Sequence, residues 1–146
     1  MPANINPIFA SRGLLPWSDN VTVANINQDG SGALNFFKVA GAEWVTPADG
    51  VFVLGIRFKS KGANVASLAR VFIARTGIGG STTINDIFML PELVLPATAL
   101  SQTAPQGDLI LPMGYILPAG HRIFWTLATA VATGWQAMAV VGDYTA

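Results

Sequence analysis

The chain of 146 residues has no cysteine and only one histidine, His121. The absence of cysteine excludes a disulfide-bonded secreted scaffold and any zinc or iron–sulfur site with cysteine ligands. A transition-metal site would depend almost entirely on carboxylates, and the eight acidic residues are scattered singly along the chain. No serine motif accompanies His121 to suggest a nucleophilic relay. We therefore expect no metal, no cofactor and no catalytic residues.

Charged residues are also scarce, at 11% of the chain, where about 25% is usual in globular domains. The eight basic residues equal the eight acidic ones, so the chain lacks the basic field that nucleic-acid binding needs. Apolar residues make up 51% of the chain. A lone domain of this composition would expose apolar surface, which usually marks a contact site. The composition favours either a membrane protein or a subunit that hides much of itself in an assembly.

The membrane alternative depends on one segment, residues 123–142, which carries no charge and is long enough to span a bilayer as a helix. The segment is interrupted by Thr129, Thr133 and Gly134 and divides into two runs typical of strands. The first twenty residues contain three prolines and no apolar core of a signal peptide. We expect no membrane association.

The N-terminal stretch, residues 1–32, is predicted to be an extended arm. Pro2, Pro7 and Pro16 bias the residues before them away from helix. The arm is too apolar for a disordered tail and has no periodicity of its own. It packs either on its own domain or on a neighbouring subunit, as exchanged elements do. The predicted contact residues are its large apolar side chains: Ile8, Phe9, Leu14, Leu15 and Trp17.

Residues 33–146 are predicted to form one β-sandwich domain. Short apolar runs alternate with Gly- and Pro-rich turns, and no window keeps a capped helical stripe. The expected strands lie at 33–39, 51–58, 65–75, 82–95, 109–111, 122–129 and 134–144, with a bend or a break at Pro91. We predict an all-β fold, an antiparallel β-sandwich or jelly roll of seven to eight strands.

Two local patterns raise the possibility of ligand binding. Residues 25–30 place oxygen-bearing side chains and a glycine as the start of a calcium loop does, but Phe36 stands where the bidentate glutamate belongs. A solvated turn is the simpler interpretation. Four tryptophans could form a sugar-stacking platform, although aromatic residues in strands are more often core residues. They are Trp17, Trp44, Trp125 and Trp135.

Four short motifs occur in order along the domain. They are WVTPADGV at 44–51, ILPAGHRI at 116–123, VATGW at 131–135 and GDY at 142–144. This layout resembles small β-sandwich virion proteins of tailed bacteriophages, the capsid decoration (cement) and fibre-associated modules. The resemblance covers residues 33–146. It implies a structural virion protein assembled in the host cytoplasm.

On this resemblance we expect a cement protein that binds over capsomer junctions and stabilises the phage head. Its partners would be the major capsid protein or another virion protein, and the chain would form a homo-oligomer, a dimer or a trimer. The alternative is a tail-fibre or baseplate-associated module that binds a host surface glycan or joins tail parts. A homo-oligomeric bacterial binding module remains a third possibility.

Overall fold

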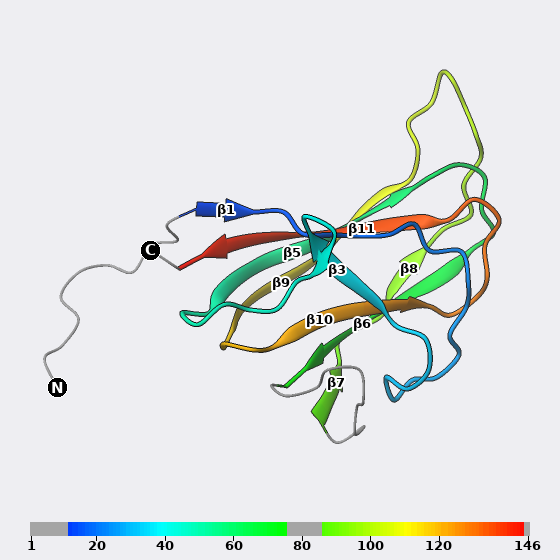
Figure 1. Cartoon of the computed structure of the whole chain (residues 1–146). Coiled ribbons are helices and arrows are strands. Elements are labelled where there is room, and N and C mark those ends of the chain that lie inside the picture. Colours follow the sequence, from blue (N-terminus) through cyan, green and yellow to red (C-terminus); the bar gives the residue numbers. More distant parts are fainter. Residues whose placement is uncertain (1–11, 76–85, 145–146) are drawn as a thin grey trace, which may run out of the picture.

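A computed structural model describes residues 12–75 and 86–144 of the chain (Figure 1). In these residues the secondary structure is β-strand, and all strand pairs are antiparallel. The strands are β1 (Arg12–Leu14), β2 (Trp17–Ser18), β3 (Asn35–Val39), β4 (Ala42–Glu43), β5 (Val51–Ser60), β6 (Ser67–Ala74), β7 (Ile87–Met89), β8 (Leu93–Leu95), β9 (Asp108–Leu117), β10 (Arg122–Leu127) and β11 (Trp135–Asp143). The predicted all-β antiparallel class is confirmed.

The strand count differs from the prediction of seven to eight, because the described residues form eleven strands. The surplus consists of β1, β2 and β4, which have only two or three residues each. Pro91 separates β7 from β8, as expected of a residue that cannot donate to a ladder. The membrane-helix alternative for residues 123–142 is wrong, since this segment forms β10 and most of β11.

The sheet is continuous but curls on itself so that two groups of strands face each other (Figure 1). Its order is β7-β6-β10-β3-β2-β11-β5-β9. One end of β3 pairs with β10 through Asn35 and Phe36, and the other end pairs with β2 through Phe37 and Lys38. β3 therefore joins a first layer of β2, β5, β9 and β11 to a second layer of β6, β7, β8 and β10.

The core fills the space between the two layers. In β11 every second side chain is buried, because successive residues of a strand point to opposite faces. β5 alternates in the same way on either side of one shift at Gly55 and Ile56. Large aromatic residues occupy the middle, and Phe58 of the first layer meets Trp125 of the second edge-on at 5.2 Å between ring centroids. Trp135 is fully buried beside them in the same core.

The described part of the arm belongs to the sheet of its own chain. β1 pairs with the end of β11, and the register places Arg12 opposite Asp143. The guanidinium lies 2.7 Å from the carboxylate of Asp143, which is buried. β2 continues along β11, with Trp17 opposite Met138. Residues 12–18 therefore pack on their own domain, while the predicted contact residues Ile8 and Phe9 lie outside the described residues.

The outer face of the second layer carries a small hydrophobic core of its own. Phe72 and Phe124 stack at 5.1 Å, and Phe36 lies at 5.9 Å from Phe124. Leu34 packs on this cluster from the loop that precedes β3. The tip of the same loop reaches β7, because a Cβ on Gly30 would lie 2.7 Å from the side chain of Ile87. Residues 24–34 thus form a cover over this face.

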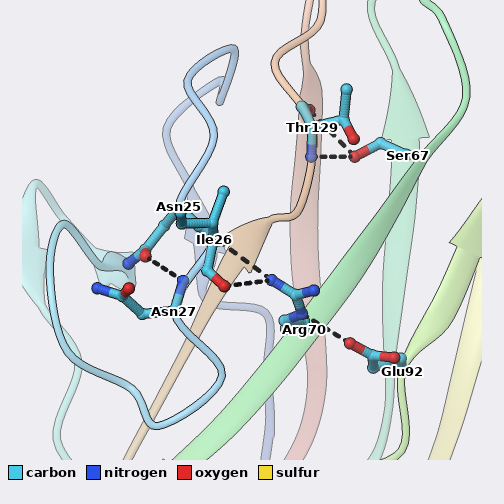
Figure 2. Close-up of polar contacts among 7 residues, drawn as sticks. All are labelled: Asn25, Ile26, Asn27, Ser67, Arg70, Glu92 and Thr129. Atoms are coloured by element: carbon cyan, nitrogen blue, oxygen red, sulfur yellow. Dashed lines mark hydrogen bonds and ion pairs between the residues drawn. The ribbon is translucent and has the colours of Figure 1, made fainter.

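An arginine buried under the cover fastens it to β6 (Figure 2). Arg70 donates from Nη1 to the carbonyl oxygens of Asn25 and Ile26, each at 3.3 Å. Its Nε donates to Glu92 at 2.6 Å, which compensates its charge. Ser67, the first residue of β6, exchanges two hydrogen bonds with the backbone of Thr129. The cover is therefore held by polar contacts as well as by packing.

Candidate functional site

The outer face of the first layer has no comparable cover from the described residues. Its side chains come from the alternate positions of β5, β9 and β11 that do not enter the core. Three of the large apolar ones are more than half exposed: Leu54 at 60%, Ile110 at 59% and Ile116 at 67%. We call the following side chains the apolar patch: Leu15, Phe52, Leu54, Ile110, Pro112, Ile116 and Val140.

The strand register brings the members of the apolar patch together. Phe52 lies opposite Ile116, and Gly55 lies opposite both Pro112 and Val140. Cross-strand neighbours on one face are about 5 Å apart at Cβ and are in contact range. The patch therefore extends across three strands, with Gly55 between Pro112 and Val140.

A β-bulge shapes the middle of the patch. The consecutive residues Val140 and Val141 of β11 lie opposite Gly55 and Val53, so that Leu54 is the extra residue of β5 and has no partner in this ladder. A side chain at Gly55 would meet the carbonyl oxygen of Leu111 at 2.9 Å, which explains why glycine stands there. Leu54 and Ile110 line a groove of about 220 Å³ beside the bulge. The bulge thus turns a large apolar side chain outward and hollows the surface next to it.

Beyond Arg57 the same face becomes polar, and it is hollowed around Trp17. The hollow has a volume of about 460 Å³ and is lined by Trp17, Arg57, Lys59, Lys61, Asp108, Gln136, Ala137 and Met138. Trp17 is 56% exposed and also lines a second hollow of about 310 Å³ on its other side. We call the larger one the Trp17 hollow.

An ion pair borders both the apolar patch and the Trp17 hollow. Arg57 donates from Nε to Oδ1 of Asp108 at 2.8 Å and from Nη2 to Oδ2, a bidentate arrangement. The hydrogen bond from Arg57 lowers the pKa of Asp108 below its ordinary value and outweighs the small cost of desolvation. Lys59 approaches the same carboxylate at 3.9 Å. Asp108 therefore stays ionised at neutral pH.

The predicted contact residues divide between the outer face and the core. Leu15, 49% exposed, and Trp17 lie on the face that holds the apolar patch and the hollow. Leu14 is partly buried and packs against the core, because it lies opposite Val141 and shares its inward direction. The sequence-based selection missed Leu54, Ile110 and Ile116; the alternation of residues 51–58 and 108–117 is the signal that could have found them.

The four tryptophans have different surroundings. Trp125 and Trp135 are fully buried and Trp44 is 6% exposed, so the core interpretation is correct for these three. Only Trp17 of the four offers its indole to solvent. A platform built from several tryptophans is therefore wrong, and any stacking site depends on Trp17 alone.

The calcium-like segment is a turn that serves the cover. The side chain of Asn25 donates to the carbonyl oxygens of Ser31 and Ala33 and accepts from the backbone of Asn27. Figure 2 shows Asn25 and Asn27 beside the carbonyl groups that Arg70 binds. These hydrogen bonds shape the loop and account for its polar residues.

His121 lies between a tight turn and β10, with its Nδ1 3.4 Å from the carbonyl oxygen of Ala119. In the ranges 12–75 and 86–144, no three acidic or histidine side chains gather as metal ligands. The same ranges contain no helix with the length and hydropathy that a bilayer crossing requires.

Comparison with protein-family models, with curated proteins and with solved structures gave no match to this chain. The outer face of the first layer, with the apolar patch and the Trp17 hollow, is the candidate functional surface.

Proposed function

We propose that the chain is a structural protein of a tailed-phage particle, a cement protein that binds over capsomer junctions and stabilises the head. Its contact surface is the apolar patch, and its mode of action is binding without catalysis. The observation that carries the proposal is the contiguity of the patch across β5, β9 and β11. The virion assignment itself is supported by the short motifs of residues 33–146 that resemble phage decoration and fibre-associated modules.

The patch defines the chemistry of its partner. It contains no charged side chain. The charged residues at its borders compensate one another in the ion pairs Arg12–Asp143 and Arg57–Asp108. A partner with an unpaired charge over the patch would lose hydration without gaining a counter-charge. The matching surface is therefore an uncharged, apolar protein surface, and its burial contributes about 25 cal/mol per Å².

Self-association is part of the proposal, because a charge-poor subunit that forms a dimer or trimer hides apolar surface in a second interface. Light scattering on a size-exclusion column measures the mass. The variant Leu54→Glu distinguishes a patch that docks on the particle from a patch that binds a second copy of the chain. We expect this variant to keep the wild-type mass and to lose particle binding; dissociation of the oligomer would assign the patch to a second copy instead.

The fibre or baseplate module is the second candidate, and it would use the same patch to join tail parts. The two candidates differ in the position of the protein on the particle. Gold-labelled antibody on particles of the phage that encodes the chain should decorate the head shell. Labelling confined to the tail would replace the cement assignment by the second candidate, and unlabelled particles would overturn both.

The binding experiment uses heads purified from a phage that lacks the gene, mixed with purified protein and sedimented. Wild-type protein should co-sediment. Leu54→Glu places a charge in the patch, and we expect it to reduce binding at least tenfold, about 1.4 kcal/mol. The matched control is Val94→Glu on β8, where the side chain is 64% exposed, close to the 60% of Leu54. Equal loss in both variants, or in neither, would contradict docking through the patch.

A further inference from the structure

The Trp17 hollow lies toward the opposite end of the outer face from Phe52 and Ile116, and its lining is of a different kind. The apolar patch is uncharged, whereas the hollow combines one exposed indole with four charged side chains. A volume of about 460 Å³ falls within the range of about 300–1,000 Å³ that small-molecule sites occupy. The hollow therefore has the size and the mixed lining of a ligand site.

The polar side chains of the hollow are held in place before any ligand arrives. Gln136 donates from its amide to the carbonyl oxygen of Ser18 at 2.8 Å. Arg57 and Asp108 fix each other through two parallel hydrogen bonds. Three planar polar groups are thus oriented around an indole, and a ligand that uses them loses less entropy on binding than it would with mobile partners.

The charge of the hollow is positive. Arg57 and Asp108 compensate each other, which leaves Lys59 and Lys61 in excess. Lys59 reaches Asp108 only at 3.9 Å, and Lys61 forms no ion pair with the rest of the described residues. An anionic group on the ligand would therefore find two ammonium groups beside the indole.

We propose that the Trp17 hollow binds an acidic saccharide, one that carries a carboxylate on its sugar ring. The apolar face of the ring lies on the indole of Trp17, the hydroxyl groups meet Gln136 and Asp108, and the carboxylate faces Lys59 and Lys61. An acidic peptide would also satisfy the two lysines, but a sugar ring offers the indole an apolar face and offers Gln136 and Asp108 hydroxyl groups that both donate and accept. This site is independent of the cement role, because a protein docked on the apolar patch uses different side chains.

Trp17 reports its own occupancy, because the other three tryptophans are buried. Iodide should quench mainly the fluorescence of Trp17. We expect 3′-sialyllactose and a tri-galacturonate to protect it from quenching, with affinities that weaken as salt rises. Lactose, which has no carboxylate, should protect it at least tenfold less well. Equal protection by lactose, or no protection by either acidic sugar, would overturn the proposal.

Variants separate stacking from charge. Trp17→Ala should weaken binding of 3′-sialyllactose about tenfold or more in calorimetry, and Trp17→Phe, which keeps an aromatic face, should retain most of it. Lys61→Gln should weaken the acidic sugars severalfold and leave the weak lactose signal unchanged. Ile116→Ser, at the far end of the face, is the control that should bind as wild type.

Two results would overturn the assignment to saccharides while leaving the cement role intact. One is binding of 3′-sialyllactose that survives Trp17→Ala, which would indicate a charge attraction without stacking. The other is tighter protection of Trp17 by a hexa-glutamate peptide than by either acidic sugar, which would assign the hollow to an acidic protein segment. Loss of head binding in Leu54→Glu tests the cement role and leaves these sugar measurements unaffected.

Discussion

The two outer faces of the curled sheet both carry large apolar side chains, but these side chains are buried on one face and exposed on the other. On the second layer, the outward residues of β6 and β10 include Phe72 and Phe124, and both are almost fully buried. On the first layer, the outward residues of β5 and β9 include Leu54 and Ile110, and both are more than half exposed. On the second layer Leu34 of the cover packs on these two rings together with Ile87 and Met89 of β7. The cover of residues 24–34 lies over this face and not over the other.

The comparison shows that burial of an outward apolar residue here depends on a loop distant in sequence. The cover needs Arg70 beneath it, Leu34 in its packing and Gly30 at its tip. On the first layer, β1 and β2 pair with β11 as neighbouring strands of the sheet. They therefore widen the face and do not cover it. The uncovered face is therefore the one available to a partner.

Truncation of one aromatic residue on each face should give the largest contrast. Phe124→Ala removes a ring stacked at 5.1 Å on Phe72 and should lower the free energy of unfolding by about 3–4 kcal/mol. Leu54→Ala on the uncovered face should cost about 0.5 kcal/mol or less. Urea denaturation of the isolated protein measures both. Similar losses would show that Leu54 is buried in solution, for example in an oligomer.

Detachment of the cover should have the next largest effect. Arg70→Met keeps the length of the side chain but removes its hydrogen bonds to the carbonyl groups of Asn25 and Ile26 and its ion pair with Glu92. We expect a loss of about 2 kcal/mol, since two carbonyl groups and a carboxylate lose their partner.

The same variant should expose the cover to proteases. Limited proteolysis followed by mass spectrometry should find new cleavage within residues 24–34, because local opening controls access to a loop. Arg57→Met on the uncovered face is the matched control and should leave this pattern unchanged. A wild-type digestion pattern in Arg70→Met would show that packing holds the cover without the arginine.

A smaller effect is expected at the tip of the cover. Gly30 has a φ of +82°, and an added Cβ would lie 2.7 Å from the side chain of Ile87. Gly30→Ala should cost about 1–2 kcal/mol from the left-handed backbone, plus the adjustment of Ile87. Gly41 has a similar φ of +80°, and an added Cβ would meet nothing within 4 Å. Gly41→Ala therefore measures the cost of the left-handed backbone without a steric contact. Equal losses would mean that the tip does not press on Ile87.

The sequence predicts the class of the fold well because the signals are local. Alternation in residues 51–58, the turn residues between runs and the break at Pro91 each depend on neighbours a few positions away. The short strands β1, β2 and β4 escape this kind of prediction, since their pairing with β11 and β3 is decided by segments far along the chain. The strand count was therefore predicted too low.

The site was predicted only in part for the same reason. Leu14, Leu15 and Trp17 are all apolar residues of a Pro-rich arm. Leu14 alone of the three points toward the core, because it lies opposite the buried Val141 of β11. Leu54 and Phe72 are equally apolar in sequence, and nothing local shows that residues 24–34 cover one of them. The exposure of the apolar patch is a tertiary property, set by where the cover lies.

The ion pair of the uncovered face should give the smallest effect, visible as a dependence of stability on pH. Because the hydrogen bonds from Arg57 lower the pKa of Asp108 in the folded protein, the pair stabilises at neutral pH. This contribution is lost as the pH falls from the ordinary carboxyl range through the lower folded-state pKa. Since both partners are partly exposed and solvent screens the pair, we expect this contribution to be the smallest of those considered.

Asp108→Asn and Arg57→Gln should each remove this contribution, so the urea midpoint of either variant should fall less than that of wild type between about pH 6 and about pH 3. The pair Arg70–Glu92 lies beneath the cover, where added salt screens it less than it screens Arg57–Asp108. High salt should therefore abolish the difference between Asp108→Asn and wild type but leave the loss in Arg70→Met largely intact. The same salt response at both pairs would show that the cover does not shield Arg70, and the contrast between the two faces would then be one of packing alone.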